Sequence, residues 1–133
     1  MVAIAAGAAL WACNSPTDPQ RDLAREVVII SGDNQTVPLG GIIPQSIVIE
    51  VRDERGRPVR LNPVYWTVEH KTEGRIGLVI EALAETDRHG RAAGKVQVDT
   101  IPGEYFVNIW AGEYVNEAGE TVEVVGTARV FAN

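Results

Sequence analysis

The chain has 133 residues and a formal net charge of -6 at neutral pH, with 18 acidic against 12 basic side chains. This balance argues against nucleic acid as a partner, because nucleic-acid binding needs a concentrated basic face. It also argues against purely electrostatic attachment to anionic lipid. With 45% hydrophobic and 23% charged residues, the chain is globular and long enough for one domain with a core and a tail.

The first thirteen residues have the pattern of a secretory signal. Residues 2–12 carry no charge and end at Cys13, the single cysteine, as an apolar region followed by small residues does before a cleavage site. Leu10 to Cys13 (LWAC) resembles the bacterial lipobox, Leu-x-(Ala/Gly)-Cys. That resemblance implies cleavage before Cys13, lipidation of its sulfur and a tether to a lipid bilayer. The alternative is a free cysteine after an apolar terminus.

Residues 14–25 (NSPTDPQRDLAR) are polar and contain two prolines, which is typical of a flexible spacer. We therefore divide the chain into a signal and lipobox segment over 1–13, a flexible linker over 14–25 and a folded domain over 26–133.

The domain consists of short apolar segments separated by turns at roughly ten-residue spacing, without a long amphipathic helix. Side chains alternate between apolar and polar within these segments, as in strands with one buried face. Gly126 interrupts the last segment, where a β-bulge is expected. The predicted strands cover residues 26–31, 36–41, 47–52, 64–69, 76–84, 91–98, 104–111 and 121–131.

Large aromatic side chains on the inward parity identify the centre of the core. Trp66 alternates with Tyr65 and Thr67, and a large inward Trp is a natural centre for two packed sheets. Tyr105 follows Pro102-Gly103 at the start of its strand, so its hydroxyl either bonds back to the backbone as a tyrosine corner or the ring simply packs inward.

The pattern predicts an all-β fold, an antiparallel immunoglobulin-like (Ig-like) β-sandwich of about seven strands with Greek-key connections. It resembles the bacterial Ig-like domains of the invasin and intimin group, the Big family. That resemblance implies an extracytoplasmic module of an adhesin or surface lipoprotein, in the periplasm, at the outer membrane or on the cell surface. The matching segments are residues 27–35 (VVIISGDNQ), 51–53 with 56–59, 64–66, 86–92 and 102–105.

Catalytic chemistry has little support in this sequence. His70 and His89 both fall in predicted loops, and no nucleophile or carboxylate at a readable spacing pairs with either of them. We therefore predict a non-enzymatic protein without a cofactor.

Metal binding is not predicted either, since ligation by His or Cys would need further residues of these types. Several acidic residues lie in predicted turns, but Asp and Gly are also what such turns use, so calcium is not an expected partner. These residues are Asp33, Asp53, Glu54 and Asp87.

The outward parity carries a second set of apolar and aromatic side chains, namely Tyr65, Phe106, Trp110, Val125 and Phe131. A contiguous exposed patch with Trp and Tyr marks a binding surface. The expected partner is another protein or a membrane protein complex. The alternative is an adhesive or carbohydrate-binding module, because exposed aromatic rings also stack on sugars.

Overall fold

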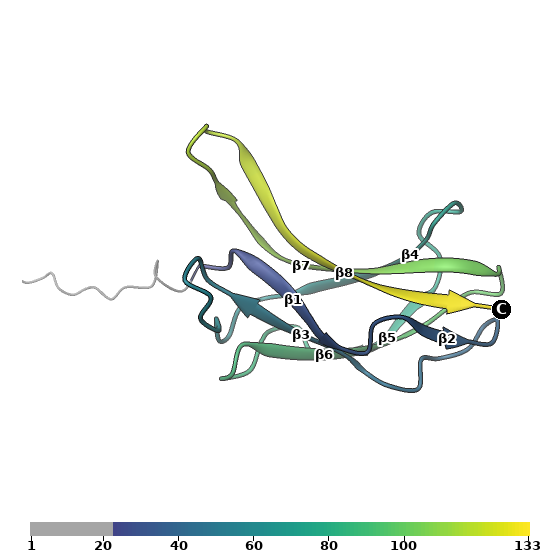
Figure 1. Cartoon of the computed structure of the whole chain (residues 1–133). Coiled ribbons are helices and arrows are strands. Elements are labelled where there is room, and N and C mark those ends of the chain that lie inside the picture. Colours follow the sequence, from purple (N-terminus) through teal and green to yellow (C-terminus); the bar gives the residue numbers. More distant parts are fainter. Residues whose placement is uncertain (1–22) are drawn as a thin grey trace, which may run out of the picture.

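The computed structural model describes residues 23–133, and all the regular elements in this range are strands (Figure 1). Short apolar segments that alternate with polar side chains form strands because one face of each can be buried. The strands are β1 (Glu26–Ser31), β2 (Gln35–Val37), β3 (Ile47–Arg52), β4 (Tyr65–His70), β5 (Leu78–Ala82), β6 (Arg91–Gln97), β7 (Gly103–Val115) and β8 (Thr121–Ala132).

Two four-stranded sheets pack face to face, one ordered β1-β3-β6-β5 and the other β2-β8-β7-β4 (Figure 1). Without β2, this is the order of the seven-strand Ig sandwich with its Greek-key connections. The predicted all-β sandwich is therefore confirmed. β2 pairs parallel to β8, which makes that sheet mixed. The reason is that the chain crosses from the first sheet to the second between β1 and β2.

The core lies between the sheets and is built from the inward parity of each strand. Ile47, Ile49 and Val51 of β3 are fully buried, and they belong to one core cluster with the buried residues of β7 and β8. Trp66 is 7% exposed, and its indole Nε1 donates to the Leu83 carbonyl oxygen at 3.1 Å. The ring also covers Gly94 of β6, so Trp66 connects the two sheets.

Tyr105 is fully buried, and its hydroxyl donates to the Ile101 carbonyl oxygen at 2.6 Å. This is the geometry of a tyrosine corner, combined with inward packing of the ring. His70 packs edge-on against the same ring, with the centroids 4.9 Å apart. The prediction that His70 lies in a loop is wrong, because it is the last residue of β4 and is buried, with Nδ1 accepting from the backbone N–H groups of Thr72 and Glu73.

The bulge expected at Gly126 lies instead on the neighbouring strand. The register between β7 and β8 shifts between Trp110 and Gly112, so Ala111 is the extra residue. Gly126 remains in register and is small for a packing reason, because a Cβ there would lie 2.7 Å from Val27 Cγ1 of the opposite sheet. The glycine thus allows β1 to approach β8 closely.

The folded domain begins before residue 26. Ala24 is buried in the core, and the Arg25 backbone N–H donates to the Arg52 carbonyl oxygen at 2.8 Å. These two residues belong to the sandwich because they extend β1 along β3, so the linker predicted over 14–25 is too long at this end. Cys13 and the predicted signal segment lie outside the described residues. Within residues 23–133, no helix is long and apolar enough to cross a membrane.

Candidate partner-binding face

The outer face of the β2-β8-β7-β4 sheet carries a row of three apolar side chains on adjacent strands. Tyr65 of β4 lies opposite Trp110 of β7, which lies opposite Val125 of β8. The Tyr65 and Trp110 rings are 6.3 Å apart and tilted by 45°. Tyr65 is 62% exposed and Val125 41% exposed. Three of the five residues predicted as a patch therefore form one row, which we call the aromatic row.

A shallow depression of about 410 Å³ lies beside the aromatic row, at the β7 bulge. The chain before β4 turns away from β7 at the same level. The lining is almost wholly apolar and consists of Pro63, Val64, Tyr65, Trp110, Ala111 and Gly112.

Phe106 and Phe131 lie on the same face but are separated from the aromatic row. The next row is polar, with Asn108 between Thr67 and Thr127, and the Thr127 hydroxyl donates to Asn108 Oδ1 at 2.7 Å. Both phenylalanines are half-buried.

Their cross-strand neighbours are mostly charged. Phe106 lies between Glu69 and Arg129, and Phe131 lies between Glu104 and Thr36. The predicted patch of five is therefore two surfaces, of which the aromatic row is the contiguous one.

Beyond the aromatic row, β7 and β8 continue as a two-stranded ribbon that projects from the sandwich (Figure 1). We call residues 112–124 the ribbon. Glu113 and Glu123 are exposed and lie opposite each other, one row beyond Trp110. At the base of the ribbon, the Arg25 guanidinium stacks 4.1 Å over the Tyr114 ring.

The predicted strands end at residue 111 and begin again at residue 121, so the prediction missed the continuation of β7 into the ribbon. A signal was present in Asn116-Glu117-Ala118-Gly119, which repeats the Asx-x-x-Gly pattern of two earlier turns. In all three turns, the first side chain accepts backbone N–H groups two and four residues later.

Those hydrogen bonds account for the aspartates of two of the three acidic turns, Asp53 and Asp87. Burial acts to raise the pKa of Asp53, but the backbone N–H groups of Arg57 and Arg55 and the Arg57 guanidinium together outweigh it, so the pKa lies below its usual value. The pKa of Asp87 is also lowered, chiefly by the backbone N–H groups of Arg91 and His89. In both turns, one carboxylate oxygen accepts hydrogen bonds from the backbone N–H groups of its own turn. Among residues 23–133, no group of three His, Cys, Asp or Glu side chains could hold a metal ion.

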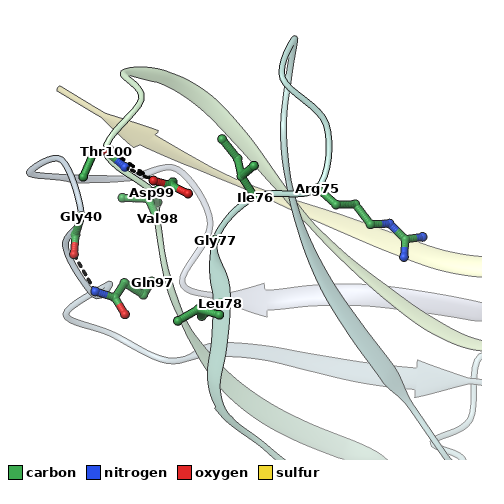
Figure 2. A pocket seen from close by; sticks show the side chains of 9 residues that line it. All are labelled: Gly40, Arg75, Ile76, Gly77, Leu78, Gln97, Val98, Asp99 and Thr100. Atoms are coloured by element: carbon green, nitrogen blue, oxygen red, sulfur yellow. Dashed lines mark hydrogen bonds between the residues drawn. The ribbon is translucent and has the colours of Figure 1, made fainter.

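A second depression, of about 480 Å³, lies at the start of β5 (Figure 2). Its polar groups are engaged locally, since Gln97 Nε2 donates to the Gly40 carbonyl oxygen at 2.8 Å and Asp99 Oδ1 accepts from the Thr100 backbone N–H at 2.6 Å. Figure 2 shows the Arg75 side chain pointing away from Asp99. The depression therefore lacks the paired titratable groups that acid–base chemistry requires.

Solved structures with this architecture are known. The Lin-41 filamin domain aligns with a TM-score of 0.53 at 17% sequence identity, over 84% of this chain and 95% of that one. Domains 1–6 of the surface layer protein SbsC align with a TM-score of 0.50 at 18% identity, over 84% of this chain and 13% of that one. AggA, the major subunit of aggregative adherence fimbriae type I from Escherichia coli, aligns with a TM-score of 0.42 at 16% sequence identity, over 84% of this chain and 98% of that one.

No protein-family model and no curated protein matches the sequence of this chain. At the identities of the first two structures, the likeness shows the fold alone. The chain is an Ig-like sandwich.

The other outer face of this Ig-like sandwich carries an ion-pair cluster in which a buried carboxylate meets two partly exposed arginines. Glu50 of β3 is 7% exposed and accepts from Arg52 Nε at 2.7 Å and from Arg91 Nε at 3.0 Å. The Arg52 hydrogen bond lowers the pKa of Glu50, burial opposes it, and the Arg91 hydrogen bond adds to the lowering. The net direction is downward, so the folded protein favours the ionised carboxylate.

Replacing Glu50 by Gln is expected to lower the free energy of unfolding by about 1–3 kcal/mol near neutral pH, because hydrogen bonds to charged groups are lost. Because the pKa of Glu50 is lowered in the folded state, its ionised carboxylate stabilises the fold at pH values above the pKa of an unfolded glutamate, near 4.5. This stabilisation is lost as the pH falls through the folded-state pKa. Urea unfolding followed by circular dichroism should show the difference in free energy of unfolding between wild type and Glu50→Gln shrinking as the pH falls below 4.5. A difference that is unchanged with pH would contradict this account.

Proposed function

We propose that this chain is a non-enzymatic, membrane-tethered extracytoplasmic Ig-like module that binds another protein through the aromatic row. The observation that carries the proposal is the contiguous row Tyr65–Trp110–Val125 beside an apolar depression, in which Tyr65 and Val125 are exposed and Trp110 is half-buried. Aromatic side chains over a partly formed pocket are the usual anchors of protein interfaces, where a few residues contribute most of the binding energy.

The depression favours a protein partner over a sugar. Sugar binding calls for aromatic rings with several flanking polar groups that hydrogen-bond hydroxyls, whereas the lining here is almost wholly apolar. The charged side chains lie further out, at Glu69 and Arg129 on one side and at Glu113 and Glu123 on the other. An apolar centre with a charged rim is the arrangement of a protein interface.

The tether in this proposal rests on Leu10 to Cys13 and on the resemblance to bacterial Ig-like domains of the Big family. An accessory or structural subunit held at the membrane surface would present its outer sheet face to a larger assembly. Intact mass of the membrane-extracted protein is expected to give an N-terminus at lipidated Cys13. A peptide that still begins at Met1 would exclude the anchor and leave the binding face untouched.

The binding face is tested by photo-cross-linking in native membranes. A photoreactive amino acid at Tyr65 is expected to give a cross-linked product of defined mass, and the same amino acid at Glu81 on the opposite sheet is expected to give none. Adding Trp110→Ala to the protein that carries the photoreactive group at Tyr65 is expected to weaken association by about 2 kcal/mol, roughly thirtyfold.

Phe106→Ala is the matched control, because it removes an aromatic ring from the same face outside the aromatic row. It is expected to leave the cross-link in place. No cross-link at Tyr65, or equal loss with Phe106→Ala, would overturn the proposal.

A further inference from the structure

Among residues 23–133, one edge of β7 is unpaired just beyond the aromatic row. β4 ends its pairing at Tyr65, opposite Trp110, while β7 runs on to Val115 beside β8. Apart from β8, no strand within residues 23–133 pairs with β7 from Gly112 to Val115. A free strand edge presents unpaired N–H and C=O groups, which is a template for another strand.

The chain that enters β4 leaves this edge uncovered. Pro63 bridges to Glu85, and the Val64 backbone N–H donates to the Ala84 carbonyl oxygen at 2.9 Å. The segment therefore approaches from the β5 side. Asn62 Nδ2 donates to the Ala111 carbonyl oxygen at 2.9 Å. This hydrogen bond satisfies the carbonyl of the bulge residue and does not extend to Gly112. The open edge begins at the apolar depression and continues the line of β4.

The side chains of the ribbon indicate the charge of an added strand. Glu113 and Glu123 face each other on the exposed side, and like charges directly opposite are destabilising. Glu117 and Glu120 lie at the tip. The ion pairs found among residues 23–133 use none of these four glutamates.

We propose that an extended segment of a partner protein, bearing lysine or arginine at alternate positions, adds as a strand to the β7 edge from Gly112 to Val115. Its cations then meet Glu113 and Glu123 on the outer face, and its alternate apolar side chains lie on the opposite face with Gly112 and Tyr114, next to the depression that Gly112 lines. A second copy of this chain is not the occupant, because it would bring the same acidic ribbon against itself. This inference rests on the proposed function, since it assigns the partner chemistry of the same face.

The test uses the full chain in neutral detergent and an eight-residue peptide that alternates lysine and valine. Two matched peptides separate the contributions, one with glutamate for lysine and one N-methylated at alternate amides, which blocks strand pairing. The lysine–valine peptide is expected to bind and to slow amide hydrogen exchange at residues 112–115. The two matched peptides are expected to do neither.

Charge is tested with Glu113→Gln plus Glu123→Gln, which is expected to weaken peptide binding on the order of tenfold at low salt. Glu73→Gln plus Glu81→Gln changes the net charge equally, away from the ribbon, and is expected to have no effect.

Equal binding of the N-methylated peptide, or no protection at residues 112–115, overturns strand addition. If the Tyr65 cross-link still depends on Trp110 in that case, the proposed function stands and only this inference fails. Loss of the Tyr65 cross-link altogether would remove the proposed function itself.

Discussion

Replacing Trp66 by Ala is expected to lower the free energy of unfolding by about 3–5 kcal/mol. The ring is 7% exposed and lies so close to β6 that a Cβ on Gly94 would be 2.9 Å from Trp66 Cζ3. Its removal leaves a cavity between the sheets and the Leu83 carbonyl oxygen without its indole donor. A loss of this size is a large part of the total stability of a small domain, which is about 5–15 kcal/mol.

Tyr65→Ala is the control for this variant, because the two residues are neighbours on β4 that point to opposite faces. Tyr65 is 62% exposed, so its loss is expected to change the free energy of unfolding by less than about 1 kcal/mol. Urea unfolding followed by circular dichroism measures both variants without relying on the indole that is removed. A Trp66→Ala loss below about 1 kcal/mol would show that the ring does not connect the sheets.

Side-chain alternation predicts most of this fold, because a strand with one buried face must repeat every two residues. Trp66 and Tyr105 are inward as expected, and Ile47, Ile49 and Val51, which share one parity of β3, are all buried. Alternation fails where the backbone departs from regular pairing. The extra residue Ala111 changes which face the next side chains occupy, so Glu113 rather than Gly112 follows Trp110 on the outer face.

The candidate site shows the second limit of alternation. Parity gives the face on which a side chain lies, but only cross-strand register gives its neighbours. Tyr65, Trp110 and Val125 share a row because β4, β7 and β8 pair at those residues. Phe106 has the same parity and lies two rows away, with Asn108 between. The pairing of β2 with β8 was likewise not predictable from parity, because it depends on where the chain changes sheets.

Gly32 lies where the chain crosses from the first sheet to the second, and Gly32→Ala is expected to cost about 3 kcal/mol or more in the free energy of unfolding. Its φ of 89° is in the left-handed region, which an L-residue adopts at a cost of about 1–2 kcal/mol. A Cβ would also overlap the Ser46 carbonyl oxygen and lie 2.7 Å from Ile47 Cα. Both atoms are backbone at the start of β3, so relief requires the strand to shift.

Gly56→Ala separates the two causes of that loss. Gly56 has a φ of 81° with nothing within 4 Å of the Cβ that alanine would add, so its replacement carries the conformational cost alone, about 1–2 kcal/mol. Equilibrium unfolding in urea should therefore give Gly32→Ala a free energy of unfolding that is lower than that of Gly56→Ala by more than about 1 kcal/mol. Equal losses in the free energy of unfolding would mean that the backbone at Ser46, where β3 starts, shifts at no cost to accept the added Cβ. In that case the crossing would not be what holds β2 parallel to β8 in the sheet that carries the aromatic row.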